Sequence, residues 1–92
     1  MTSYKTILDI AYDKIKEYDF VQMTEEESDD ILKSYIRPAC VDYFYKRKKK
    51  LNRDEELECF EEDLDDIDVV VLATYIIIRY IDANYINTTL ML

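Results

Sequence analysis

The 92-residue chain contains no glycine and a single proline, Pro38. Glycine supplies the positive φ angles that tight hairpin turns need, so a chain without it is not expected to be rich in β-hairpins. Asparagine and aspartate also take left-handed positions, so a chain without glycine can still form some tight turns. The composition favours short helices joined by polar loops, and we predict an all-α fold.

Histidine and tryptophan are absent as well, and Cys40 and Cys59 are the only cysteines. Without histidine, the chain lacks the commonest general base and metal ligand near neutral pH. Phosphate-binding loops require glycine, and two isolated cysteines do not make a zinc site in a monomer. We therefore expect a protein that is not an enzyme, with no catalytic, cofactor-binding or metal-binding residue and with both cysteines as reduced thiols.

Acidic residues outnumber basic ones by 21 to 12, which gives a formal net charge of −9. This charge disfavours general binding to nucleic acid or to anionic membranes, because both surfaces repel it. The longest apolar run, residues 69–78, is shorter than the roughly 20 residues that a bilayer-spanning helix needs. No targeting segment is recognisable, so we expect a cytoplasmic protein without membrane contact.

The charges are segregated along the chain. Residues 46–50 are all basic, with Arg53 close behind, whereas residues 54–68 carry ten acids and no base. The basic run has three interpretations: it complements the negative end of a helix dipole, it contacts the acidic segment of the same or a neighbouring subunit, or it contacts nucleic-acid phosphates. The acidic segment is interpreted as a solvated face or a protein-binding patch. A calcium loop of the EF-hand type would need glycine at its sixth position.

Apolar spacing predicts a first helix over residues 3–18, because its apolar residues recur every three or four positions. They are Tyr4, Ile7, Leu8, Ala11, Ile15 and Tyr18. Thr24 and Glu27 form a capping box that predicts the start of a second helix, which runs to about Lys48. Its stripe consists of Leu32, Tyr35, Ile36, Ala39, Cys40, Tyr43 and Phe44.

Pro38 interrupts that second helix. Proline removes a helical hydrogen bond and clashes with the carbonyl four residues before it, at a cost of ~3 kcal/mol. Because the apolar stripe keeps its phase on both sides, we predict a kink near residues 34–38. The alternative is a true break, with a new helix starting at Pro38.

Within the acidic segment, Leu57, Phe60 and Leu64 recur at helical spacing and predict a short helical or turn-like stretch held to the core by all three side chains. Asp65 is a candidate N-cap for a last helix over residues 66–83, which is apolar almost all round. Such a helix must be covered on several sides. We therefore predict a small bundle of three to four helices with this helix at its centre, partly covered by a neighbouring subunit.

The whole chain, residues 1–92, is interpreted as a single helical domain, in which residues 84–92 form a tail apolar enough to dock onto another surface.

The order of these signals resembles a known family. A capping box is followed by a helix with a basic end, and then by LNRDEELECFEEDLDDIDVVVLATYIII. This is similar to the small helical head–tail connector, adaptor or neck proteins of tailed bacteriophages, over about residues 24–82. The residues that match their pattern are Arg53, Asp54, Glu55, Glu56, Leu57, Phe60, Asp63, Leu64, Leu72 and Ala73. The chain departs from the pattern after residue 83, where such proteins often carry a longer arm.

The resemblance implies a structural subunit of the virion neck, assembled in the host cytoplasm. The resemblance suggests that such subunits form a ring, of twelve-fold order, beneath the portal. The ring bridges the portal to tail or stopper proteins. DNA would pass through the ring as cargo only. Two alternatives stay open on the residues alone: an acidic inhibitor or DNA mimic that uses residues 54–68 to bind a nucleic-acid enzyme, and a small DNA-binding regulator that uses residues 46–53.

Overall fold

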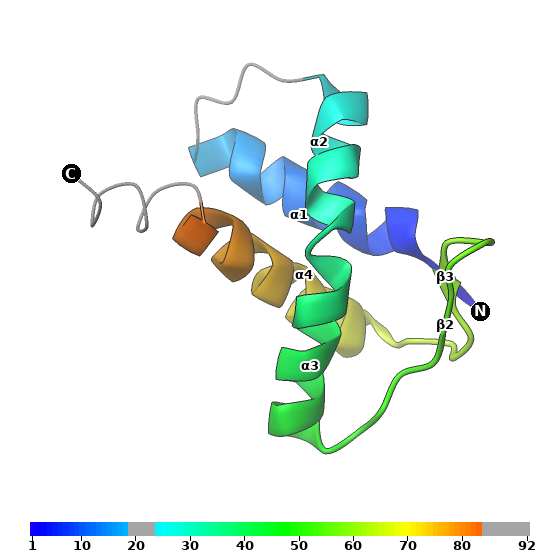
Figure 1. Cartoon of the computed structure of the whole chain (residues 1–92). Coiled ribbons are helices and arrows are strands. Elements are labelled where there is room, and N and C mark those ends of the chain that lie inside the picture. The colour runs from blue at the N-terminus through cyan, green and yellow to red at the C-terminus, as the bar shows by residue number, and fades with distance from the viewer. Residues whose placement is uncertain (19–23, 84–92) are drawn as a thin grey trace.

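Helices make up most of the chain in the computed structural model, which describes residues 1–18 and 24–83 (Figure 1). The described part holds four α-helices: α1 (Tyr4–Tyr18), α2 (Glu25–Lys33), α3 (Ile36–Arg47) and α4 (Asp66–Ile81). It also holds three two-residue strands: β1 (Thr2–Ser3), β2 (Arg53–Asp54) and β3 (Cys59–Phe60). The prediction of a mainly helical chain is confirmed. The predicted docking tail, residues 84–92, lies outside the described residues.

The predicted first helix is confirmed as α1, and its apolar stripe is buried. Five residues of the stripe are at most 6% exposed: Tyr4, Ile7, Leu8, Ala11 and Ile15. They belong to one hydrophobic cluster to which α2, α3, α4 and β3 also contribute. The capping of α2 is confirmed too, since the Thr24 hydroxyl accepts the backbone N–H of Glu27 at 3.1 Å.

The apolar helix α4 lies between α1 and α3 and packs against both (Figure 1). Asp65 caps it as predicted, because its Oδ1 accepts the backbone N–H of Asp68 at 2.8 Å. On the α3 side, the Arg79 guanidinium donates two hydrogen bonds, of 2.9 and 2.7 Å, to the carboxylate of Asp42. The β-branched residues of α4 have a weak preference for strands, and burial between two helices outweighs it.

The structure does not confirm one kinked helix on both sides of Pro38. Helix α2 ends at Lys33, Ser34 and Tyr35 form a turn, and α3 begins at Ile36. A continuous helix would bring the proline ring against the carbonyl of Ser34. In the observed arrangement Pro38 lies in the first turn of α3, where its missing N–H is not needed. The result is nearer to the predicted alternative of a true break, with the restart two residues before the proline.

A small sheet is present that the composition did not predict. Strand β3 lies in its middle, with β1 and β2 antiparallel on either side, so that Thr2 and Arg53 both oppose Phe60. Residues 55–58 form the turn between β2 and β3, and Glu58 adopts a φ of 52° there. A non-glycine residue in that region costs about 1–2 kcal/mol. The absence of glycine therefore made this hairpin more costly but did not prevent it.

Because of the hairpin, only part of the prediction for residues 54–68 is confirmed. Phe60 is 1% exposed and packs edge-to-face against Tyr4, with ring centroids 5.2 Å apart. Leu64 is half-buried against the same core. Leu57 is 66% exposed, so the prediction that it anchors the segment is wrong. Pairing of β3 with both neighbours buries Phe60 and leaves Leu57 on a turn outside the core.

Candidate interaction surfaces

In the part of the chain that the structure describes, the two thiols and the carboxylates are not gathered into a reactive site. Cys59 is buried, and burial raises the pKa of the half-buried Cys40 to about 11, which keeps that thiol protonated near neutral pH. Within residues 1–18 and 24–83, no cluster of three or more cysteine and carboxylate side chains is placed to hold a metal ion. No helix in that part of the chain is both long and apolar enough to span a bilayer. Two surfaces of the described residues remain as candidates for a function.

Most carboxylates of the acidic segment bind groups of the same chain. Some pair with a cation, as Glu55 does with Arg53 at 3.4 Å, and others accept backbone N–H groups. The acids bound in one of these ways are Asp54, Glu55, Glu58, Glu62, Asp63, Asp65 and Asp68. Only Asp54, Glu62 and Asp68 of the ten acids are not exposed, so the segment still presents an acidic surface and the acidic-inhibitor alternative stays open.

Asp68 is a buried carboxylate at the start of α4, only 4% exposed. The Tyr43 hydroxyl donates a hydrogen bond of 2.7 Å to its Oδ1. The cations of Arg47 and Lys49 lie 3.6 and 3.9 Å from its two oxygens. Two members of the basic run thus contact the acidic segment of their own chain, as one of the three interpretations predicted. The last turn of α3 is also basic, which fits the interpretation based on the helix dipole.

Ionisation of the Tyr43 hydroxyl makes the free energy of unfolding depend on pH in the alkaline range. Burial and then the hydrogen bond to Asp68 raise the pKa of Tyr43 from 10.0 to about 12. Because the folded-state pKa is the higher one, the stabilisation is complete below about pH 10 and is lost as the pH rises through about 12. We expect the free energy of unfolding, measured with urea across this range, to fall less steeply in Tyr43→Phe than in the wild type.

The control for this titration is Tyr45→Phe, since Tyr45 is 67% exposed. That variant should follow the wild-type dependence on pH. If Tyr43→Phe followed it as well, ionisation of Tyr43 would not be a cause of the alkaline destabilisation.

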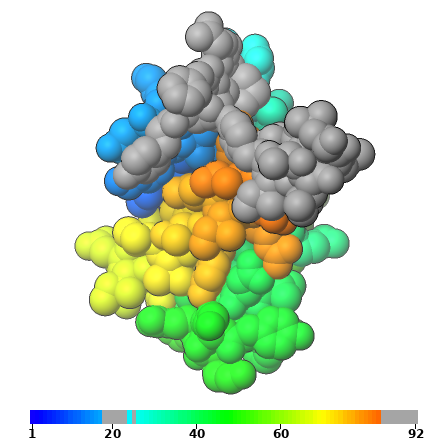
Figure 2. All heavy atoms as spheres, turned by 90° about the vertical axis from the view of Figure 1, so that its left-hand side faces the viewer, coloured from blue at the N-terminus to red at the C-terminus, as the bar shows by residue number. Residues whose placement is uncertain are grey.

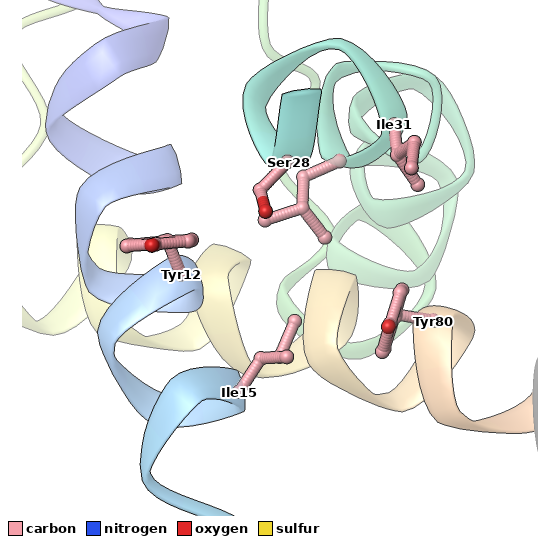
Figure 3. A pocket seen from close by; sticks show the side chains of 6 residues that line it. Tyr12, Ile15, Ser28, Ile31 and Tyr80 are labelled. Atoms are coloured by element: carbon pink, nitrogen blue, oxygen red, sulfur yellow. The ribbon is translucent and has the colours of Figure 1, made fainter. Parts of the chain in front are cut away.

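The cavity between α1, α2 and α4 is a gap in the packing (Figure 3). It encloses about 10 Å³, which is near the lower limit for a single water molecule. Its lining side chains are Tyr12, Ile15, Ser28, Ile31, Leu32 and Tyr80. A cavity of this size holds no organic ligand, so it does not add a binding site.

Helix α4 exposes a row of aliphatic side chains, which we call the α4 stripe. Ile67, Val70, Ile78 and Ile81 are 63, 51, 53 and 41% exposed. Their spacing of three, eight and three residues places them on one side of a helix, with the exposed Thr74 in the interval. Figure 2 shows α4 reaching the surface between α1 and α3. Exposed aliphatic side chains grouped on one side of a helix, here two pairs on either side of Thr74, are typical of an interaction surface.

A second surface lies beside α3, and we call it the α3 groove. It is an open depression of about 430 Å³ between α3 and the chain that leads from α3 into β2. Its apolar side chains include Val41, Phe44 and Tyr45, which are 47, 45 and 67% exposed. Arg37, Lys50 and Arg53 also line it, together with Cys40 and Leu51. The groove thus combines exposed aromatic rings with three cations.

The groove was not identified from the sequence. The predicted stripe of the second helix included Phe44, which the structure leaves 45% exposed next to Tyr45, with the two rings 6.2 Å apart. Two adjacent aromatic residues cannot both face the core from one helix, since neighbours differ by about 100° around the axis. The adjacency of Phe44 and Tyr45 in the sequence therefore indicated that at least one of the two rings would be exposed. The contribution of Arg53 follows only from the path of the chain after α3.

Comparisons with known proteins do not add a family assignment. Neither protein-family models, nor curated proteins, nor solved structures gave a match to this chain. The resemblance of residues 24–82 to phage connector proteins stays a prediction. The α4 stripe and the α3 groove are therefore the observations on which a functional proposal depends.

Proposed function

We propose that the chain is a non-catalytic structural subunit that associates with copies of itself through the α4 stripe. The four exposed aliphatic residues of that stripe are the single observation that carries the proposal. They lie on the same helix whose other side forms the centre of the core. A helix that is apolar on both sides is expected where a second molecule completes its burial.

The identity proposed for the subunit is a head–tail connector of a tailed bacteriophage, located in the virion neck. Support comes from the resemblance over residues 24–82 and from the surplus apolar surface, which suits a ring. A net charge of −9 suits a channel through which DNA passes without being held. Portal protein on one side and a tail or stopper protein on the other are the further partners of this proposal.

The experiment measures mass in solution by light scattering during size-exclusion chromatography, with and without portal protein. The wild type should form discrete multiples of its 11.1 kDa chain, alone or on the portal. The double variant Val70→Glu/Ile78→Glu should elute as a folded monomer, because two charges then replace apolar contacts. Circular dichroism verifies the helix content of each sample.

A matched control is Thr6→Glu, which adds the same charge at an exposed position of α1, outside the stripe. It should assemble as the wild type does. A wild type that stays monomeric at high micromolar concentration and ignores portal protein would rule the proposal out.

A further inference from the structure

The α4 stripe alone is too small to hold copies together. Its four side chains are about half exposed, so covering them contributes about 1 kcal/mol each. Association costs an estimated 4–15 kcal/mol in lost translational and rotational freedom. If copies associate as proposed, a second contact is needed, and the α3 groove is the surface with the chemistry to supply it.

We infer that the α3 groove binds the turn of residues 55–58 from a second copy of this chain, with Leu57 as the apolar anchor. This inference rests on the proposed self-association and names its second contact. Each copy then donates one turn and accepts another.

The turn presents an apolar side chain surrounded by acids. Leu57 is 66% exposed, and its neighbours in the turn are Glu55, Glu56 and Glu58, all exposed. The groove offers the complement, because Val41 and the two aromatic rings provide apolar area and three cations also line it. Glutamates placed against arginine and lysine gain charge-assisted hydrogen bonds, while leucine covers the rings.

The turn is ordered before it binds. The Oδ1 atom of Asp54 accepts hydrogen bonds of 3.0 Å from the backbone N–H groups of Glu56 and Leu57. Pairing of β2 with β3 fixes both ends of the turn, and the Glu58 carboxylate pairs with Lys33. Little conformational entropy is therefore lost when such a turn docks, which favours binding.

The turn of the same chain does not occupy its own groove. Arg53, the first residue of β2, lines the groove. The turn follows directly after β2, at residue 55, so β2 connects the groove to the turn. Leu57 of the same chain does not line the groove and remains exposed. The hairpin lies at the edge of the molecule away from the C-terminal end of α4, where another copy can approach it (Figure 1).

Charge complementarity between the turn and the groove also reduces the electrostatic repulsion between copies. Chains of net charge −9 repel one another, and this repulsion opposes assembly at low salt. A contact that sets the acids of one copy against Arg37 and Lys50 of the next offsets the repulsion where the copies meet, while Arg53 stays paired with Glu55 of its own chain.

The test is a charge exchange between the two surfaces. Glu56→Lys and Arg37→Glu should each raise the concentration at which half the chains are assembled by at least about tenfold, because each places like charges together. Both residues are exposed in the single chain, so neither change should alter the fold. The double variant Glu56→Lys/Arg37→Glu should recover assembly. An equimolar mixture of the two single variants should recover it too, since each variant's turn then matches the other's groove.

Two further variants complete the design. Leu57→Ser should weaken assembly as strongly as the charge changes, whereas Glu61→Lys, an exposed acid outside the turn, should leave it within about twofold of the wild type. If the turn and groove variants assemble like the wild type while Val70→Glu/Ile78→Glu is monomeric, the inference fails and the proposed function stands. A monomeric wild type overturns both.

Nucleic acid is the competing occupant, because aromatic rings beside cations also bind single-stranded DNA. A fluorescein-labelled oligonucleotide is therefore titrated into the wild type and into Arg37→Glu at low salt. No binding is expected. Binding that Arg37→Glu abolishes, together with assembly that Glu56→Lys leaves unchanged, would overturn the inference and assign the groove to DNA.

Discussion

Replacing Phe60 with alanine is expected to lower the free energy of unfolding by about 4 kcal/mol. The Phe60 ring is 1% exposed and packs edge-to-face on Tyr4, while its backbone lies in the middle strand of the sheet. Truncation removes the apolar contacts of an entire ring and leaves a cavity between α1 and the hairpin. Urea unfolding followed by circular dichroism measures the loss.

Leu57→Ala is the matched control in the same acidic segment. Its side chain is 66% exposed, so its truncation should change stability by less than about 0.5 kcal/mol. Equal losses at Phe60 and Leu57 would contradict the observed hairpin and favour the helical segment that the spacing predicted. The same Leu57→Ala sample also shows whether any effect on assembly arises without an effect on folding.

Asp68→Ala is expected to destabilise the fold by about 3 kcal/mol. The change leaves the buried Tyr43 hydroxyl without its acceptor and removes the carboxylate that Arg47 and Lys49 approach. It also removes an acid from the first turn of α4, where the helix dipole favours negative charge. The loss is measured by urea unfolding at neutral pH.

Asp66→Ala is the control for this effect. It removes an acid from the same turn of α4, but Asp66 is exposed. Its loss should stay below about 1 kcal/mol, the usual size of a dipole interaction at the surface. Comparable losses at Asp66 and Asp68 would show that the dipole, and not the buried contacts, accounts for the stability.

Local signals along the chain were sufficient for α1 and for the starts of α2 and α4. The spacing of apolar residues in α1 and the caps at Thr24 and Asp65 are confirmed, because a helix is held by contacts between residues a few positions apart. The break between α2 and α3 was harder to place. The steric effect of Pro38 on the preceding turn is certain, but the amount of bending that the core accepts depends on what each half packs against.

The sheet and both surfaces depended on contacts between distant residues. Thr2 and Phe60 are neighbours only because β1 meets β3. Leu57 and Phe60 have the same local context of acids and apolar residues, yet one is exposed and the other is buried. No pattern within the segment distinguishes them, since strand pairing with the N-terminus makes the difference.

By itself, the sequence determined that this protein is mainly helical, acidic, and centred on one apolar helix, since composition and short-range spacing are local properties. The tertiary structure alone decided which apolar residues remain outside and which charges meet. A few short helices can cover only a limited apolar area, so some apolar side chains of a short chain remain exposed. The path of the chain decides which ones these are. Of those side chains, the α4 stripe carries the proposed function, and the α3 groove and the turn of residues 55–58 carry the further inference.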